Sequence, residues 1–251
     1  MVWKVIAMNS LLEAIYAFSV EKLPYITIFV TFIGVALRVM RWRSSPPDHE
    51  KIKMDPVESI KYVILDVVLF RKTWKTDKVM WLALFLFHGS VAGIVFGHMR
   101  GFHIWSIHMF ESLGHTFAEF MVHTLPIYVG YVFIITQVYF LIRRVMLENK
   151  QLTSMPNDYI ALVLLLLKSI AGQGMRLVPP EGVPSTLYSV VFIPRFVVLH
   201  LETIPNSHWF HVHIILTQLF IMYVPFSKFI HIITGVIAPA IYGSRRKEID
   251  R

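Results

Sequence analysis

The sequence contains no cysteine. Without thiol ligands the chain cannot by itself hold an iron–sulfur cluster, attach a c-type haem covalently, or form a disulfide. Charged side chains are also scarce, at 16% of the 251 residues. The segment from Met1 to Lys22 has no small-residue cleavage site, so we expect no cleaved signal peptide there. These absences leave apolar side chains and histidine as the informative features.

Apolar side chains dominate the composition. Hydrophobic residues make up 55% of the chain, and the mean hydropathy is +0.58. Several apolar runs approach the ~20 residues that a helix needs to cross a bilayer. We therefore expect one all-α, polytopic membrane domain covering residues 1–251. Five transmembrane helices are predicted, at about residues 23–39, 79–98, 121–142, 159–174 and 209–233.

Two other segments mix polar and apolar residues. They cover about residues 2–20 and 57–70. We predict that both form amphipathic helices that lie in the membrane interface and do not cross it.

The distribution of Lys and Arg predicts the orientation. Nine lie between residues 41 and 78, three between 142 and 158, and four after residue 237. The opposite segments carry one in 99–120, two in 176–208 and two before the first span. Because cytoplasmic loops are enriched in Lys and Arg, we expect the amino terminus outside and the carboxyl terminus in the cytoplasm. This topology and anionic lipid explain the net charge of +8, so no nucleic-acid partner is expected.

Six histidines lie within the predicted spans, where an ionisable side chain indicates function, and four of them are the candidate ligands. His88 and His98 belong to the second span, His213 and His231 to the fifth. In a continuous helix the step from His213 to His231 makes about five turns, so both would point the same way. Two helices that each present two imidazoles at different depths can hold two flat cofactors, each bound from both faces. Bis-histidine haem b has this ligation.

The predicted topology pairs these histidines. The second span runs outward and the fifth runs inward, so His88 should face His231 near the cytoplasm, and His98 should face His213 near the exterior. The depths of the two pairs do not match fully. The ten residues from His88 to His98 rise about 15 Å, whereas the eighteen from His213 to His231 rise about 27 Å. We expect helix tilt and a bend at Pro225 to absorb the difference.

Short motifs around these histidines carry a family resemblance. Leu84-Phe-Leu-Phe-His88 precedes Gly97-His98, and Val212-His213-Ile precedes Pro225-Phe-Ser-Lys-Phe-Ile-His231. Together with Leu23-Pro-Tyr-Ile, they resemble the gamma subunit of respiratory nitrate reductase, a five-span di-haem cytochrome b. The segment from Tyr62 to Lys75 is more similar to two relatives: the cytochrome b of the sulfite-reduction-associated complex (DsrM) and that of membrane heterodisulfide reductase.

The resemblance implies two haems b and a respiratory complex in a prokaryotic cytoplasmic membrane. In that family the histidines matching His98 and His213 bind the outer haem, and those matching His88 and His231 bind the inner one. Quinol, which we expect to be menaquinol, would supply electrons. A cytoplasmic iron–sulfur subunit, of heterodisulfide reductase or nitrate reductase beta type, would accept them. The nitrate reductase subunit has a lysine near the quinol after its second span, and this sequence has none there.

Further polar residues are candidates for the quinone site and for the haem propionates. Arg100, His103 and His115 follow the second span and can bind quinol oxygens or accept their protons. Lys168 and Arg176 are possible contacts of the propionates. The basic stretch from Lys51 to Lys78 is predicted to dock the electron-accepting partner.

Two other classes of protein remain open. A transition-metal transporter could use the same histidines, because imidazole also binds zinc, copper and nickel. The few acidic residues within the spans argue against that class. A haem-less membrane anchor would use the histidines only in helix packing. Two haems b in the purified protein would distinguish the cytochrome from both.

Overall fold

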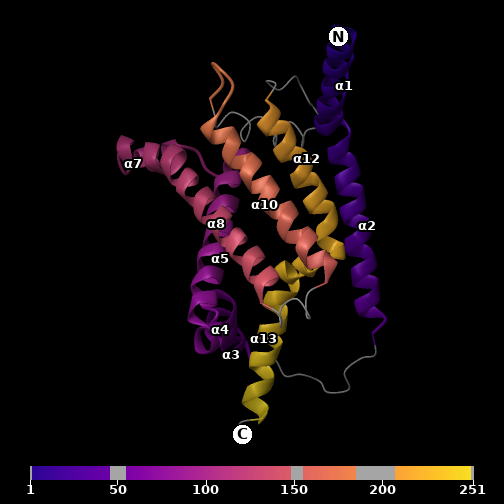
Figure 1. Ribbon diagram of the computed structural model, residues 1–251. Coiled ribbons are helices and arrows are strands. Elements are labelled where there is room, and N and C mark those ends of the chain that lie inside the picture. The colour runs from indigo at the N-terminus through magenta and orange to yellow at the C-terminus, as the bar shows by residue number, and fades with distance from the viewer. Residues whose placement is uncertain (1, 46–54, 148–154, 185–206, 250–251) are drawn as a thin grey trace.

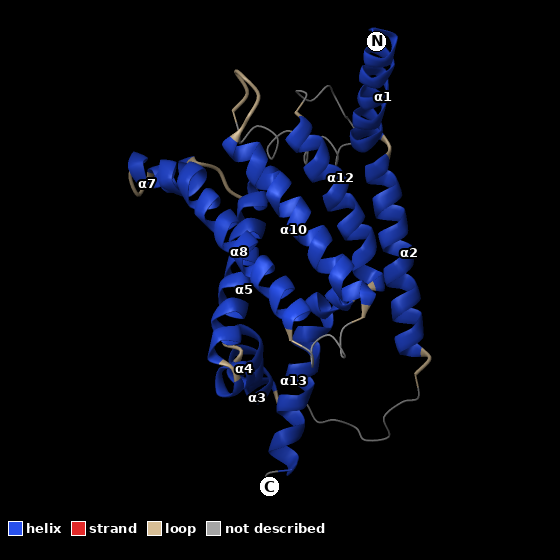
Figure 2. Ribbon diagram, viewed as in Figure 1, coloured by secondary structure: helices blue, strands red, loops and turns tan. Residues whose placement is uncertain are grey.

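The structure is a computed structural model that describes residues 2–45, 55–147, 155–184 and 207–249. Figure 2 shows helices joined by loops, and the described residues contain no strand. Five helical stretches are long and apolar enough to cross a membrane: Leu23–Arg43, Lys78–Phe102, His115–Met146, Pro156–Leu177 and His208–Phe226. The prediction of an all-α protein with five spans is confirmed. The two termini lie at opposite ends of the bundle (Figure 1), and the side that each faces stays a prediction.

The spanning helices pack in a simple order. Helix α5 (Lys78–Met99) packs on α8 (Leu125–Met146), α8 on α10 (Pro156–Leu177), α10 on α12 (His208–Tyr223), and α12 on α2 (Leu23–Arg43). Helices α5 and α12, which carry three of the four predicted ligands, are separated in this order by α8 and α10 (Figure 1). Side chains can therefore meet between α5 and α12 without close backbone packing of the two helices.

Three buried glutamines link the helices. Gln137, Gln173 and Gln218 are 1%, 6% and 5% exposed. Their amide nitrogens donate to Ser169 Oγ at 3.1 Å, Ile127 O at 3.0 Å and Ser19 O at 2.9 Å. Because lipid is as apolar as leucine, interhelical hydrogen bonds and close-packed small residues hold membrane helices together. These glutamines join α8 to α10 and the amino-terminal segment to α12.

The fifth span is present at His208–Phe226, but the helix is not continuous from His213 to His231. Helix α12 ends at Tyr223 and is followed by two 3-10 turns, Val224–Phe226 and Lys228–Ile230, and then by helix α13 (His231–Ile249). Between the turns, Ser227 is extended, with φ −115° and ψ 177°. Pro225 cannot donate a backbone hydrogen bond, which weakens the helix at this point. His231 therefore begins a new helix and does not share a helical face with His213.

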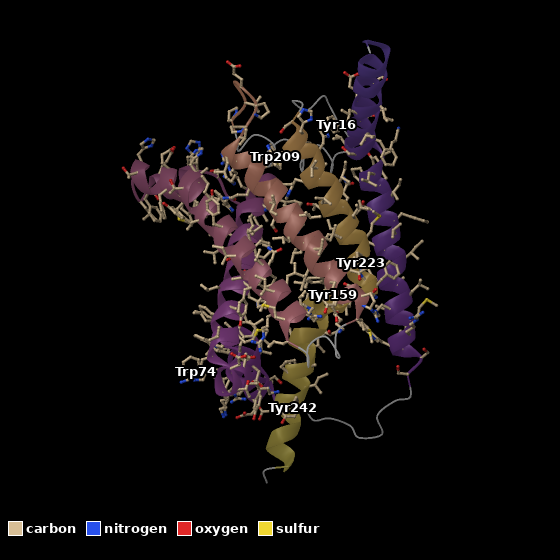
Figure 3. The ribbon with its side chains drawn as sticks, viewed as in Figure 1. Tyr16, Trp74, Tyr159, Trp209, Tyr223 and Tyr242 are labelled. Carbon is tan, nitrogen blue, oxygen red and sulfur yellow. The ribbon has the colours of Figure 1, made fainter. Side chains whose placement is uncertain are left out.

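Helix α1 (Val2–Glu21) also differs from its prediction. The helix is present, but its apolar residues do not gather on one side, so it is not amphipathic. It runs on beyond the end of α2 (Figure 1) and meets the start of α12 at Tyr16, which Figure 3 labels. The Tyr16 ring stacks on His211 at 4.0 Å, and Tyr16 Oη lies 2.5 Å from His208 Nδ1. Its position relative to a membrane stays a prediction.

The predicted helix at residues 57–70 forms part of a platform at the opposite end. Helix α3 (Pro56–Tyr62) continues into a π-helix (Val63–Val68), and helix α4 (Arg71–Thr76) follows. This platform packs on α13, where Ser59 Oγ donates to Ala240 O at 3.0 Å and the Tyr62 ring meets Tyr242 edge-on at 5.8 Å. Tyr242 and Trp74 mark this end of the molecule in Figure 3. The platform therefore supports the position of α13, the helix that begins with His231.

The connector after α5 projects sideways from the bundle. It contains a 3-10 turn (Arg100–Phe102) and the short helices α6 (His108–Glu111) and α7 (His115–Glu119), followed by a π-helix (Phe120–Thr124) that leads into α8. Figure 1 shows α7 away from the other spans. Most of this connector is therefore not covered by α10 or α12.

We predict that Gly130→Val weakens the α8–α10 packing. A Cβ at Gly130 would lie 2.9 Å from Gln173 Cδ, so a larger side chain must displace that glutamine. Overpacking of this kind costs ~1–3 kcal/mol, and the midpoint of thermal unfolding in detergent should fall. Gly235→Ala is the control, because its Cβ meets only His231 atoms, at 3.8 and 3.9 Å. Equal midpoints for the two variants would contradict the packing described.

Candidate cofactor-binding site

The four predicted ligand histidines share one hydrogen-bonding pattern. In each, Nδ1 donates to a main-chain carbonyl at 2.8 or 2.9 Å. The acceptors are Leu84 O for His88, Ile94 O for His98, Lys168 O for His213 and Lys228 O for His231. A carbonyl can only accept, so the proton lies on Nδ1 and Nε2 keeps its lone pair. Metal-binding histidines are commonly oriented in this way.

Other histidines of the described chain make different contacts. His211 is 5% exposed, and its Nδ1 lies 3.1 Å from Ser19 Oγ. His108 and His123 face the carboxylates of Glu111 and Glu119, at 2.6 and 3.7 Å. These rings meet side chains and not main-chain carbonyls, which separates them from the four candidates.

His88 and His231, which we call the inner pair, line one cavity of about 330 Å³. His88 is in the middle of α5, and His231 is the first residue of α13. The Phe87 and Phe70 rings lie 5.1 and 4.8 Å from the His88 ring, centre to centre. The cavity is at the lower end of the range for small-molecule sites, about 300–1,000 Å³.

Phe70 contacts His88 from a constrained backbone. Its φ of 48° lies in the left-handed region, which a bulky residue rarely adopts. The neighbouring Leu69 carbonyl accepts a hydrogen bond of 2.8 Å from Trp81 Nε1 on α5. This bond ties the turn before α4 to the helix that carries His88. Sequence reasoning missed this contact, because Phe70 and His88 belong to separate motifs and only the fold brings them together.

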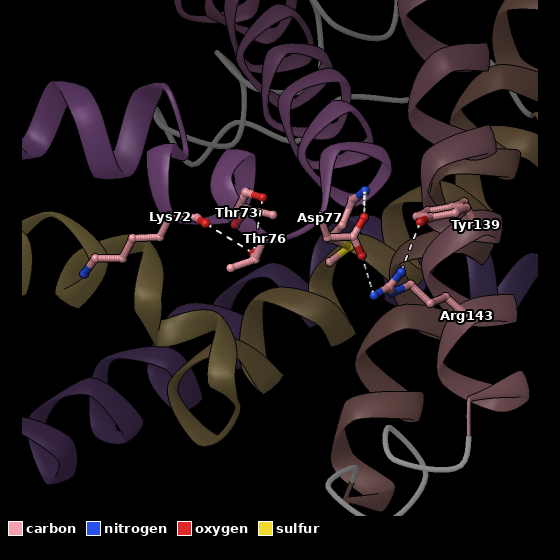
Figure 4. Close-up of polar contacts among 7 residues, drawn as sticks. Lys72, Thr73, Thr76, Asp77, Tyr139 and Arg143 are labelled. Atoms are coloured by element: carbon pink, nitrogen blue, oxygen red, sulfur yellow. Dashed lines mark hydrogen bonds and ion pairs between the residues drawn. The ribbon is translucent and has the colours of Figure 1, made fainter.

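Three cations line the cavity of the inner pair: Arg143, Arg144 and Lys228. Asp158, 7% exposed, pairs with Arg144 at 2.9 Å and with Lys228 at 2.7 Å. Arg143 pairs with Asp77 at 2.8 Å and also approaches Tyr139 Oη at 3.4 Å, as Figure 4 shows. Three cations and two carboxylates leave a net positive cluster. Sequence reasoning missed these residues, because helix-end Arg and Lys usually reflect topology alone.

His98 and His213, which we call the outer pair, lie within electrostatic reach of one another. Helix α10 comes close to the His213 ring at Gly172, where a Cβ would lie 2.9 Å from two ring atoms. Only a residue without a side chain leaves room for the imidazole there. Lys168, one turn earlier, accepts the His213 hydrogen bond with its carbonyl and lies near both histidines.

Arg100 and Arg176 line a separate small cavity of about 60 Å³. Arg176 donates to Val122 O at 3.4 Å, and Arg100 lies over the Trp105 ring at 6.0 Å. Arg176 is also within electrostatic reach of His98. Neither arginine has a carboxylate partner among the described residues. The structure thus brings together two residues to which the sequence assigned different roles.

His103 and His115 are not brought to that cavity. Both are exposed, and among the described residues neither lines the space beside Arg100. His103 has a left-handed φ of 55° just after the 3-10 turn, and His115 begins α7. The proposed grouping of Arg100 with these two histidines is therefore not compact in this structure.

The donor set suits a haem iron bound by two imidazoles. Each pair offers two Nε2 lone pairs, and an iron porphyrin with two axial histidines needs that number. The cations around the inner pair match the negative propionates that a haem carries. The residues present therefore fit the cofactor that the sequence predicted.

Five membrane-length helices with two histidine pairs between them define a multi-pass helical membrane protein. Residues 73–250 match the sequence pattern of the nitrate reductase gamma subunit family, and the chain belongs to that family. The predicted family resemblance is confirmed. The matched region contains all four candidate histidines.

Two relatives carry the description "Hdr-like menaquinol oxidoreductase cytochrome b-like subunit". The protein of Archaeoglobus fulgidus is 26% identical over 245 residues, which cover 83% of this chain and 74% of the relative. That of Archaeoglobus profundus is 24% identical over 257 residues, which cover 87% of this chain and 76% of the relative.

We predict that Asp77→Asn removes a pH-dependent part of the stability. Donation from the Met80 backbone N–H, followed by the charge of Arg143, lowers the pKa of Asp77 from 3.8. A depressed carboxyl pKa in the folded state stabilises the protein above the unfolded pKa, and this contribution disappears as the pH falls through the folded pKa. Asparagine is also a good N-cap, so the variant should isolate the effect of the charge.

Thermal melting in detergent checks this prediction. Wild type should unfold at a higher temperature than Asp77→Asn at pH 7, and the difference should shrink as the pH approaches 3. A difference that persists unchanged at pH 3 would show that the Asp77 charge does not contribute.

Proposed function

We propose that the chain is the di-haem b membrane subunit of a menaquinol oxidoreductase complex. In this proposal His88 and His231 bind the inner haem, and His98 and His213 bind the outer one. When bound, the haems would supply one-electron transfer between the quinone pool and a partner subunit. The family and the names of the two relatives support a cytochrome b role in electron transfer.

The observation that carries the proposal is the shared geometry of the four histidines. In all four, the Nδ1–H group donates a hydrogen bond to a main-chain carbonyl, which leaves the Nε2 lone pair for a metal. This arrangement holds each ring in one orientation and raises its basicity as a ligand. Helix packing alone does not require four rings to adopt the same tautomer, so the pattern favours a metal-binding role.

The cationic residues would orient the haems in the membrane. Arg143, Arg144 and Lys228 are proposed partners of the inner propionates, because they line the cavity of that pair. Arg176 is proposed for an outer propionate, and Lys168, which lies near the outer pair, is retained as a second candidate. Arginine binds carboxylates through two parallel hydrogen bonds, which fixes orientation as well as charge.

Quinol oxidation is proposed at the outer end. Arg100, His103 and His115 would bind the quinol oxygens and accept the protons as electrons leave. Of the three, only Arg100 lines the small cavity among the described residues, together with Arg176. The assignment of this end to the cell exterior follows from the distribution of Lys and Arg.

The platform at the other end is proposed to dock a cytoplasmic iron–sulfur partner of heterodisulfide reductase type. Arg71 and Lys72 lie 3.0 and 3.6 Å from the buried carboxylate of Asp66, although the Lys72 side chain is 73% exposed. Lys75 is exposed and has no ion pair among the described residues. Lys75 therefore offers a partner a charge that no carboxylate of the described residues pairs with. Residues 51–54 of the predicted docking stretch lie outside the described residues.

We expect two haems b per chain, extractable by acid because the chain has no cysteine to attach them. His88→Ala and His231→Ala should each remove the same haem signal, and His98→Ala and His213→Ala the other, because each iron loses one axial ligand. Haem content and the reduced-minus-oxidised spectrum measure this directly.

His211→Ala is the matched control for ligand loss. It lies two residues from His213 but contacts Ser19 and Tyr16, so both haems should remain. Loss of a haem in His211→Ala, with both retained in His213→Ala, would reverse the ligand assignment. A colourless wild-type protein with stoichiometric zinc would replace the proposal with a metal transporter.

Substitutions at the two ends should separate electron entry from electron exit. Arg100→Gln should slow reduction of the bound cofactors by a quinol analogue without changing haem content. Lys75→Glu should leave that reduction intact and slow reoxidation by the partner, because opposite charges steer association. Stopped-flow spectroscopy of membranes gives both rates, with Lys22→Glu at the opposite end as the control. Slower quinol reduction in Lys75→Glu alone would place the quinone site near the platform.

A further inference from the structure

Lys168 is a lysine inside a membrane-spanning helix. It lies twelve residues after Pro156 and nine before Leu177, so it is about 18 Å and 14 Å from the ends of α10. A charged side chain at such a depth is costly and usually has a function. No ion pair involves Lys168 among the residues that the structure describes.

The side chain of Lys168 instead meets an aromatic ring. Its Nζ lies over the Phe220 ring, 4.5 Å from the centroid. A cation over the face of a ring is stabilised by the ring quadrupole, more strongly where water is excluded. Phe220 belongs to α12, two turns after His213, so this contact fixes the ammonium between α10 and the helix that carries an outer ligand.

Lys168 also touches the outer pair through its backbone. Its carbonyl accepts the 2.8 Å hydrogen bond from His213 Nδ1, and its charge is within electrostatic reach of His98 and His213. One residue therefore orients a ligand with its main chain and adds a positive charge beside the same pair. The two contributions are separable, because substitution changes the side chain and keeps the carbonyl.

We propose that Lys168 sets the reduction potential of the outer haem, an inference that rests on the proposed function. Reduction adds one electron to the iron site, and a nearby fixed cation stabilises the reduced form. In a low-dielectric span this interaction is screened much less than at a surface. Lys168 is a positioning residue in this role: it binds neither iron nor quinol, and its charge makes the outer haem a better electron acceptor.

The test is a redox titration of the purified complex, with the two haems followed by their reduced-minus-oxidised spectra. Lys168→Met should lower the equilibrium constant for reduction of the outer haem about tenfold, or ~59 mV for a one-electron couple, and leave the inner haem unchanged. Lys168→Gln should give the same shift, because it removes the same charge. Lys168→Arg should restore the wild-type potential.

Two controls distinguish charge from structure. Lys22→Met removes an equal charge at an exposed position between α1 and α2 and should shift neither potential. Phe220→Leu keeps an apolar side chain but removes the ring, so a smaller shift in the same direction is expected. All variants should keep two low-spin haems, since His213 retains its carbonyl acceptor.

Failure of this inference can be told apart from failure of the proposed function. Two haems with an unchanged outer potential in Lys168→Met would overturn the role of Lys168 and leave the haem assignment intact. Different shifts for Met and Gln, with no rescue by Arg, would also overturn it, since the effect would then follow side-chain packing. Wild-type protein without haem would remove the basis of both.

Discussion

A histidine inside a membrane has two ring nitrogens and no water to satisfy them, and the structure around the candidate site depends on this constraint. In each of the four candidates, the Nδ1–H group satisfies this constraint by donating a hydrogen bond to a main-chain carbonyl. His88 and His98 use carbonyls one turn earlier in α5, where the helix supplies them without distortion. His213 reaches across to Lys168 O, which requires α10 to come close, and Gly172 permits this approach. Nε2 of each ring is then the free donor atom.

The break after α12 satisfies the same constraint for His231. Ser227 and the two short 3-10 turns interrupt the helix, and the Lys228 carbonyl then accepts from His231 Nδ1. The Lys228 side chain pairs with Asp158 of α10, so the turn that orients the histidine is also fixed to a neighbouring helix. The platform packs against α13 from the other side. Ligand orientation at the inner pair is thus coupled to the end of the molecule where a partner is proposed to dock.

Much of the architecture could be predicted from the sequence, because membrane spans are specified by local composition. The five spans and the four histidines follow from apolar runs and from ionisable residues within them. The break at residue 227 was not predictable, since a proline such as Pro225 can also sit in a bent but continuous helix. Arg143, Arg144 and Lys228 come from three distant segments, and only folding shows that they line one cavity. Arg100 lines a cavity while His103 and His115 are exposed, because the connector projects away from the bundle, and their shared role at quinol stays a prediction.

In the proposed cytochrome, two flat cofactors lie between α5 and the α12–α13 segment, each held by one histidine from either side. A cryo-electron microscopy map of the complex purified with its cofactors tests this arrangement most directly. We expect two planar densities, one joined on both faces to Nε2 of His88 and His231, and the other to Nε2 of His98 and His213. A map in which these rings contact only protein side chains, or share a single compact ion, would contradict it.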